Sequence, residues 1–260
     1  MTDHEDISIH YFEEKIKFND LLVVVTHPTI GTISSIVGNY LIENLDLRLI
    51  GAFISPDLPP TAIIRHGEPL PPVRIYAGEY KDDPDTAFDQ LVVIASDLPM
   101  ERTMMYPLAD RILEWAEFNK AKAVLTIEGI NREELTFDDD VSVYHVISTP
   151  SISEQLEDID TQKFSNGMVT GLSGLLLYKG KVAKYPVISL LADAHEKFPD
   201  SRSAAAVLSV LNKLLPKIEI DYDPLLKQAE KVEEQIRMAL SQIKQSNIPR
   251  KTDVPQGMYA

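Results

Sequence analysis

The chain has 260 residues, 44% of them hydrophobic and 25% charged, which leaves room for one large or two small globular domains. A formal net charge of −15 without a cluster of Lys and Arg excludes a nucleic-acid-binding domain, and the absence of cysteine excludes disulfides, thiolate chemistry and cysteine-ligated metals. No apolar run approaches the length of a transmembrane helix and the start is acidic and polar, unlike a signal peptide, so we expect a cytoplasmic protein without membrane contact.

The first half of the chain predicts strands that alternate with helices. Residues 21–25 form an apolar, β-branched run, which is typical of a strand buried on both faces. Apolar residues at helical spacing then predict a helix from about 33 to 44, and a second helix is expected from about 104 to 119, with Pro107 in its first turn. A proline-rich stretch lies at 56–72. Further strands are predicted at 7–12, 49–54, 73–76, 91–95, 123–127 and 141–146, the last nearer an edge of the sheet.

The second half continues this alternation. Three glycines between 167 and 174 precede an apolar helical run, and a further strand is predicted at 187–192. Asp200 is expected to cap a helix that Pro216 ends. Strands that alternate with helices over about 200 residues predict an α/β fold with a largely parallel sheet flanked by helices.

The organisation of the chain follows from these patterns. We expect an α/β core domain at residues 1–220, a C-terminal helix at 221–246 and a flexible tail at 247–260. The tail segment is assigned as flexible because it shows neither a helical nor a strand period.

The C-terminal helix is expected to begin at Asp223, a good N-cap, with Pro224 at its first helical position. Its apolar residues recur at alternating spacings of four and three, which is a heptad seam. The seam residues are Leu225, Ala229, Val232, Ile236, Ala239 and Ile243. The seam is too short to predict a free coiled coil. Two interpretations stay open: the helix packs on its own domain, or it packs against neighbouring subunits.

No segment carries a complete phosphate-binding, nucleophile or metal-binding motif. The glycines at 167–174 match neither the phosphate-loop pattern nor G-x-G-x-x-G. Gly171-Leu172-Ser173-Gly174 resembles a serine nucleophile elbow, but its second glycine comes one residue early for G-x-S-x-G, and close helix packing explains the small residues equally well. The six histidines show no metal-ligand spacing on one element. We therefore predict neither a cofactor nor a metal.

Three polar residues lie at predicted strand ends, where α/β folds place ligands. His27 follows the strand at 21–25 and is the best single candidate for a site residue, although loop structure is the commoner role. Asp97 and Glu128, at what we expect to be adjacent strand ends, suit an acid–base pair, although capping and turn roles are commoner. Because nothing nearby supplies an obvious nucleophile or oxyanion donor, we predict no catalytic residue.

The last three residues, Met258-Tyr259-Ala260, place a tyrosine and an apolar side chain beside a free carboxylate. Such an ending suits a socket with a lysine at its floor. Tails are usually disordered, and a tyrosine one residue from the end arises often by chance. The three residues alone therefore leave two interpretations, a disordered end and a docking plug on a flexible leash.

Several segments between about 20 and 245 occur in a specific order. They are His27-Pro28-Thr29-Ile30-Gly31, Gly51 to Pro60, Thr126-Ile127-Glu128-Gly129, Thr170-Gly171-Leu172-Ser173-Gly174 and Phe198-Pro199-Asp200. This order resembles the proteasome assembly chaperone family in its archaeal form. The resemblance implies an α/β core, a helical C-terminal extension and a tail that can end in the hydrophobic–tyrosine–any motif. Proteins of this family are sometimes labelled as ATP-grasp enzymes, and this sequence has no phosphate-binding signature to support that label.

The resemblance also implies a function. Such proteins are homo-oligomers that help to assemble, or activate, the 20S proteasome core particle, and their tails insert between neighbouring α-subunits of its outer ring. A lysine of the pocket then pairs with the terminal carboxylate. By position, Ala260 supplies the carboxylate, Tyr259 the ring and hydroxyl, and Met258 the apolar contact. The expected partners are therefore the 20S α-subunits and further copies of this chain, and no enzymatic activity is expected.

Two alternatives remain beside this docking function. One is an enzyme that acts on a nucleotide or similar small metabolite through His27, Asp97 or Glu128. The other is an oligomeric scaffold or adaptor for a different client, whose tail is accessible but is not used on the proteasome.

Overall fold

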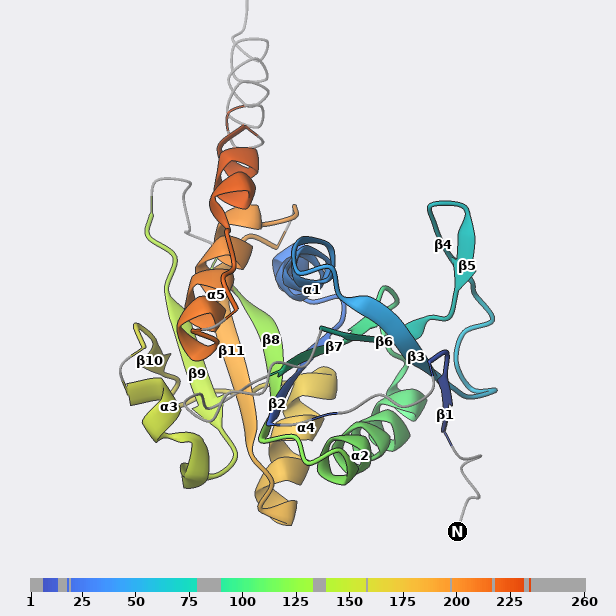
Figure 1. Ribbon diagram of the computed structural model, residues 1–260. Helices are drawn as coiled ribbons and strands as arrows, with labels where there is room; N and C mark the ends of the chain where they lie inside the picture. The colour runs from blue at the N-terminus through green and yellow to red at the C-terminus, as the bar shows by residue number, and fades with distance from the viewer. Residues whose placement is uncertain are drawn as a thin grey trace, which may run out of the picture.

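In the computed structural model, helices pack on both faces of a central sheet (Figure 1). The structure describes residues 7–13, 18, 20–78, 90–132, 139–157, 159–196, 198–216, 218–231 and 234. The strands are β1 (Ser8–Tyr11), β2 (Leu21–Thr26), β3 (Arg48–Ile54), β4 (Ile63–Arg65), β5 (Glu68–Leu70), β6 (Val73–Ala77), β7 (Gln90–Ser96), β8 (Ala123–Asn131), β9 (Val143–Ile147), β10 (Gln162–Lys163) and β11 (Val187–Ala194). The helices are α1 (Ile33–Asn44), α2 (Arg102–Phe118), α3 (Glu154–Glu157), α4 (Gly171–Ala183) and α5 (Ser201–Leu214), with short 3-10 turns η1 (Ile30–Thr32) and η2 (Pro150–Ile152). A further helical segment covers residues 223–231.

The described strands of the main sheet follow the order β1-β3-β6-β7-β2-β8-β11-β9-β10. The four central strands β7, β2, β8 and β11 are parallel to one another. Towards one edge β6, β3 and β1 pair in antiparallel fashion, and towards the other edge β9 is antiparallel to β11. The predicted α/β fold with a largely parallel sheet is confirmed, and its parallel part is the centre, where helices cover both faces.

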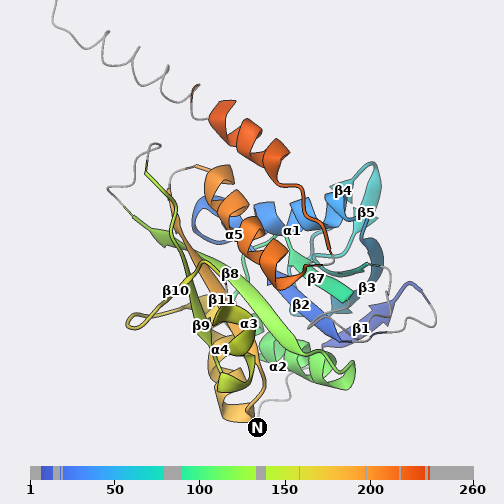
Figure 2. The same ribbon diagram turned by 60° about the vertical axis from the view of Figure 1, so that its left-hand side comes forward.

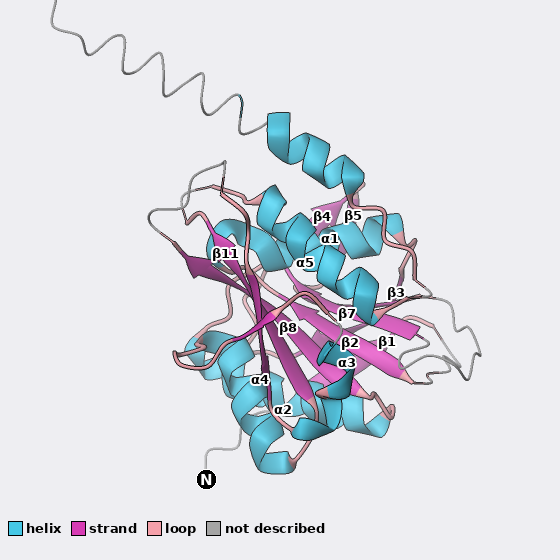
Figure 3. Cartoon of the chain, turned by 90° about the vertical axis from the view of Figure 1, so that its left-hand side faces the viewer, coloured by secondary structure: helices cyan, strands magenta, loops and turns pink. Residues whose placement is uncertain are grey.

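Strand β2 shows why the apolar runs of the sequence become central strands. All six of its residues are buried, and successive side chains of a strand point to opposite faces. Leu22 and Val24 therefore join the core beneath α1 and α5, whereas Val23 and Val25 join the core beneath α2 and α4. Figure 3 shows these two helix pairs on opposite sides of the sheet.

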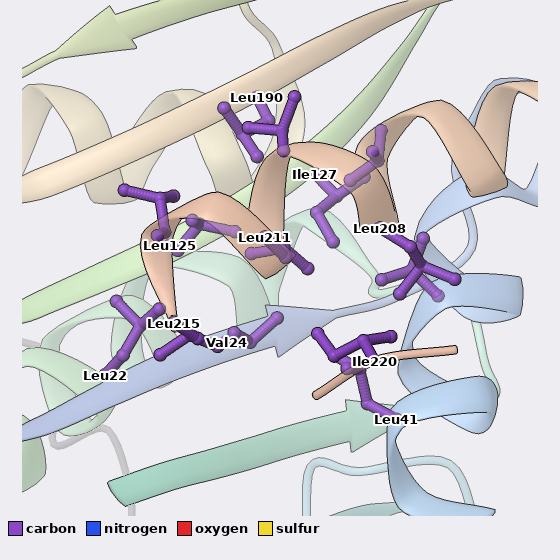
Figure 4. Close-up of a cluster of buried hydrophobic side chains, with 14 of the residues drawn as sticks. Leu22, Val24, Leu41, Leu125, Ile127, Leu190, Leu208, Leu211, Leu215 and Ile220 are labelled. Atoms are coloured by element: carbon purple, nitrogen blue, oxygen red, sulfur yellow. The ribbon is translucent and has the colours of Figure 1, made fainter. Parts of the chain in front are cut away.

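The core on the α1 and α5 side is continuous with the segment that follows α5. Figure 4 shows Leu208 and Leu211 of α5 among side chains from the sheet and from α1, with Leu215 and Ile220 extending the same cluster. Leu225 also belongs to this cluster. The segment after α5, red-orange in Figure 2, is therefore anchored on the α1 and α5 side.

Two of the element boundaries that differ from those predicted have a clear physical reading. Helix α2 begins at Arg102, so Pro107 lies in its second turn rather than its first. The proline leaves the carbonyl of Thr103 without its helical partner, and the exposure of Thr103 lets water satisfy it. Strand β8 continues past Gly129, because β11 pairs with it residue by residue as far as Asn131.

The short strands of the fold leave little periodic pattern in the sequence. The proline-rich stretch 56–72 contains the hairpin of β4 and β5, which forms a small sheet of its own. Strand β9 lies second from the edge, with β10 outside it. Among the residues described, no helix has the length and apolar character to cross a lipid bilayer.

Candidate functional site

A cavity of about 430 Å³ opens at the carboxyl ends of β2 and β8. Its walls come from the loop after β2, the end of β8, the start of α2 and the segment that leads into α4. Most of the wall is apolar, and these side chains are Pro28, Ile30, Pro99, Met100, Met105, Ile130, Phe164, Met168, Val169, Leu172 and Leu191. The position agrees with the rule that open α/β sheets bind ligands beyond the carboxyl ends of their strands.

Two glycines set the path of the backbone beside the cavity. Gly31 has a φ of 63°, which lets the chain turn from β2 into α1 without strain. A Cβ atom on Gly129 would lie 2.4 Å from the carbonyl oxygen of Ile30, so only glycine lets η1 lie directly on β8. Gly31 and Gly129 both belong to the ordered sequence motifs, so these motifs include residues that shape the cavity.

His27, at the end of β2, is largely buried and makes contacts through both ring nitrogens. Its Nδ1 lies 3.3 Å from the carbonyl oxygen of Pro28, and its Nε2 lies 3.2 Å from Oγ of Ser173. Because a carbonyl only accepts, the proton is assigned to Nδ1, and Nε2 then accepts from the Ser173 hydroxyl. Burial lowers the pKa of His27 below its usual value, which favours this neutral form.

Glu128 of β8 faces the same histidine. Its Oε1 lies 3.6 Å from Nε2 of His27, and burial raises the pKa of its carboxyl group to about 7, while a hydrogen bond with Ser173 opposes that shift. In the protonated form Glu128 donates to Oγ of Ser173, which donates in turn to His27. We call His27, Glu128 and Ser173 the polar floor of the cavity; His27 and Glu128 line the cavity, and the fully buried Ser173 joins them from α4. All three are neutral in this arrangement, which suits their burial.

The polar floor contains the residue types of a catalytic triad but lacks its geometry. In a triad the base contacts the nucleophile through one ring nitrogen and the acid through the other. Here Ser173 and Glu128 both approach Nε2 of His27, and Ser173 is fully buried in the first turn of α4. The serine therefore links two polar groups inside the protein and is not presented to a substrate.

Asp97 does not line this cavity, and the expectation that it and Glu128 lie at adjacent strand ends is wrong. Asp97 follows β7 and Glu128 lies in β8, and these strands are not adjacent because β2 lies between them. Asp97 instead forms ion pairs with Arg74 and Arg65. The Arg74 side chain is fully buried, and its charge requires a carboxylate partner there.

The sequence did not connect Ser173 with His27 and Glu128. The incomplete elbow pattern around Ser173 coincides with a structurally important residue, but the reason is packing and not nucleophilic catalysis. The small side chain of Ser173 lets α4 approach the two strand ends. The three residues could have been grouped from the sequence by noting that both strand ends and the glycine-rich turn lie on one side of a parallel sheet.

The C-terminal candidates are only partly described. Leu225 and Ala229 are buried against the chain's own body at the start of helix 223–231. The other seam residues lie outside the described residues, as does the tail: Val232, Ile236, Ala239, Ile243, Met258, Tyr259 and Ala260. Within the described ranges, no group of three or more His, Asp or Glu side chains is arranged to hold a metal ion.

Comparisons with known proteins agree with the fold. The PAC2 family matches residues 23–240. An uncharacterized protein of Methanocaldococcus jannaschii is 27% identical over 223 residues, which are 86% of this chain and 87% of that protein. The crystal structure of Pyrococcus furiosus PbaA, described as an archaeal homolog of proteasome-assembly chaperone, is similar with a TM-score of 0.77 and 27% identity, over 92% of this chain and 94% of that one.

A second archaeal structure supports the fold alone. Pyrococcus furiosus PbaB, described as an archaeal proteasome activator, is similar with a TM-score of 0.77 and 22% identity, over 90% of this chain and 99% of that one. Since the family match spans most of the chain and the described fold agrees with these structures, the protein belongs to the PAC2 family and has the fold of the archaeal proteasome-assembly chaperone homologues.

Proposed function

We propose that this protein is a homo-oligomeric chaperone or activator of the 20S proteasome core particle, and that it docks its C-terminal tails into pockets between neighbouring α-subunits. One observation carries the proposal: the chain is similar over 92% of its length to PbaA, a homolog of proteasome-assembly chaperone. The ending Met258-Tyr259-Ala260 supports it, because it offers a carboxylate, a phenol and an apolar side chain in three consecutive residues.

Each residue of the ending has its own role in the proposal. The carboxylate of Ala260 pairs with a lysine of the pocket, the ring and hydroxyl of Tyr259 pack and hydrogen-bond at the pocket edge, and Met258 makes the apolar contact. Charge-assisted hydrogen bonds of this kind are roughly twice as strong as neutral ones. The position of the terminal carboxylate therefore matters as much as the tyrosine.

The tail and the helix before it set the affinity. Residues 247–260 reach roughly 40 Å if they extend at about 3 Å per residue. A plug of three residues binds weakly alone, but several plugs on one oligomer bind together and their effective concentration multiplies the affinity. The heptad seam from Leu225 to Ile243 is proposed to hold the subunits of that oligomer together or to pack each tail's base on its own core.

A binding function is favoured over an enzymatic one. Ser173 is buried and shares Nε2 of His27 with Glu128, which does not suit nucleophilic catalysis. Asp97 is engaged by two arginines, which suits a structural role. A scaffold for another client remains the competing binding function. A comparison of the full-length chain with a chain that lacks the tail motif distinguishes it from docking on the proteasome.

The test is co-purification with 20S core particles. The full-length chain is compared with a chain that ends at Gly257, and thermal unfolding and the oligomeric state of both are measured in parallel. We expect the truncated chain to lose core-particle binding and to keep its fold and oligomeric state. Equal binding by both chains would refute tail docking, and binding of neither chain would favour a different client.

A further inference from the structure

The polar floor of the cavity offers hydrogen-bond acceptors to whatever enters it. Nε2 of His27 is an acceptor because the proton is on Nδ1, and Glu128 loses its O–H donor and only accepts once it ionises. Ser173 has one hydroxyl proton, which can serve either His27 or an ionised Glu128 but not both. With Glu128 ionised, the floor therefore has more acceptors than donors.

The side-chain charge of the cavity is equally one-sided. Among the described residues that line it, Glu128 and His27 are the titratable side chains, and no Lys or Arg is present. An anionic ligand beside Glu128 would face a carboxylate without a counter-charge. A cation would find a carboxylate, in a protein whose net charge of −15 attracts cations at long range.

The walls suit an apolar body attached to that cation. Met100, Met105 and Met168 provide flexible thioether side chains that adapt to irregular shapes, and Phe164 provides an aromatic ring. An aromatic face also attracts a nearby cation. The volume of about 430 Å³ lies within the range of small-molecule sites, roughly 300–1,000 Å³.

We propose that this cavity binds a small organic primary amine in its ammonium form, whose N–H groups donate to Glu128 and His27 and whose apolar body lies against Met105 and Phe164. A primary ammonium has three donors and no acceptor, which complements the polar floor. The site is separate from the C-terminal tail, so the proposal does not depend on docking to the proteasome.

Such a ligand would change the protonation of Glu128. Burial raises the pKa of this carboxyl group to about 7, so that it is largely protonated near pH 6. A bound cation favours the ionised form and lowers this pKa. The groups that face Glu128 are His27 from β2 and Ser173 from α4, neither of which carries a charge that would oppose this effect. Binding near pH 6 should therefore release protons.

The test compares three probes of one shape and different charge: hexylamine, 1-hexanol and hexanoate. Their affinities for the full-length protein are measured near pH 8 by calorimetry and ligand-observed NMR. We expect hexylamine, as its ammonium ion, to bind about tenfold or more tightly than hexanol, because hydrogen bonds to a charged group contribute more than neutral ones. Hexanoate should bind most weakly. Near pH 6, calorimetry in buffers of different ionisation enthalpy should detect proton release with hexylamine.

A pair of variants assigns the effect to the polar floor. Glu128→Gln keeps the size and hydrogen-bonding capacity of the side chain and should bring hexylamine and hexanol to equal affinity. Glu114→Gln removes a carboxylate from the exposed side of α2 and should leave the tenfold preference intact. If Glu128→Gln does not fold, the three probes and the proton release of the unmodified protein still decide the question.

Several results would overturn the proposal. Equal binding of the three probes would indicate a purely apolar cavity. Tightest binding of hexanoate would indicate an anion site at the start of α4, where Thr170 makes no side-chain cap. Absence of binding by all three at millimolar concentration would show that the cavity takes no such ligand.

Discussion

Nε2 of His27 lies 3.6 Å from Oε1 of Glu128, across the neighbouring parallel strands β2 and β8. Burial lowers the pKa of the histidine and raises that of the glutamate, so burial favours the neutral form of each group. The pair is therefore held by burial and by Ser173 between its members, and not by opposite charges. This relationship determines how the stability of the protein should respond to pH.

Glu128→Gln should stabilise the protein at alkaline pH relative to the unmodified chain. The pKa of Glu128 is about 7 in the folded protein against a reference of 4.5, so the protonated carboxyl group favours folding. That contribution is fully present below about pH 4.5 and is lost as the pH rises through about 7. The variant cannot ionise, and its advantage in the free energy of unfolding should grow by on the order of 2–3 kcal/mol over this window.

Urea denaturation of both proteins at a series of pH values, at one protomer concentration, measures this difference. Glu114→Gln, at the exposed surface of α2, provides the control and should show no growth of this kind. A pH-independent difference between Glu128→Gln and the unmodified protein would mean that Glu128 titrates normally in the fold.

Removing Asp97 should destabilise the protein strongly. Asp97→Ala leaves the guanidinium of Arg74 fully buried without its carboxylate, although Tyr76 and the carbonyl oxygen of Pro71 still accept hydrogen bonds from it. The expected loss in the free energy of unfolding is about 3 kcal/mol. Arg65→Ala breaks the other ion pair of Asp97, but the partly exposed groups can be hydrated, and the loss should stay below about 1 kcal/mol.

Chemical denaturation of these two variants tests the structural assignment of Asp97. Losses of similar size in both would contradict it, because the burial of Arg74 is the reason for the expected difference.

Gly129→Ala should disturb the packing between β8 and η1. The new Cβ would lie 2.4 Å from the carbonyl oxygen of Ile30, and backbone must move to accommodate it. Overpacking of this kind costs about 1–3 kcal/mol. Gly78→Ala is the matched control, since its Cβ would meet the flexible end of Leu47 at 3.2 Å.

Denaturation gives the stability of these glycine variants, and the probe assay of the cavity gives a second reading for Gly129→Ala. A variant at Gly129 as stable as the one at Gly78 would show that η1 does not need this close approach.

Two changes at the C-terminus should separate the contributions of tyrosine and carboxylate to docking. Tyr259→Ala removes the ring and hydroxyl, and one residue added after Ala260 displaces the carboxylate. Because several plugs act together, loss of one contact in every tail should weaken binding to the core particle by about two to four powers of ten. Met258→Leu keeps an apolar side chain and should bind nearly as well as the unmodified chain.

Surface-immobilised 20S core particles and the full-length variants measure these affinities. Tight binding by the extended chain would indicate that the carboxylate is not used, while tight binding by Tyr259→Ala would remove the tyrosine from the proposed contact.

Local patterns predicted the elements whose residues carry their own signal. The apolar run at 21–25 became β2 because a central parallel strand is buried on both faces. Asp200 was expected to cap a helix, and its Oδ1 accepts a hydrogen bond from the backbone nitrogen of Ser203 at 3.0 Å. In contrast, the hairpin of β4 and β5 follows no periodic pattern, because three-residue strands are too short to show one.

The amino-acid sequence by itself determined the α/β class, the central strands and the family resemblance, because apolar periodicity, capping residues and motif order are local properties of the chain. Only the tertiary structure decided which polar residues meet. The insertion of β2 between β7 and β8 brings His27 to Glu128 and separates Asp97 from it, and the packing of α4 adds Ser173. Such contacts depend on the order of strands in the sheet, which joins residues far apart in the chain and leaves no spacing for the sequence to reveal.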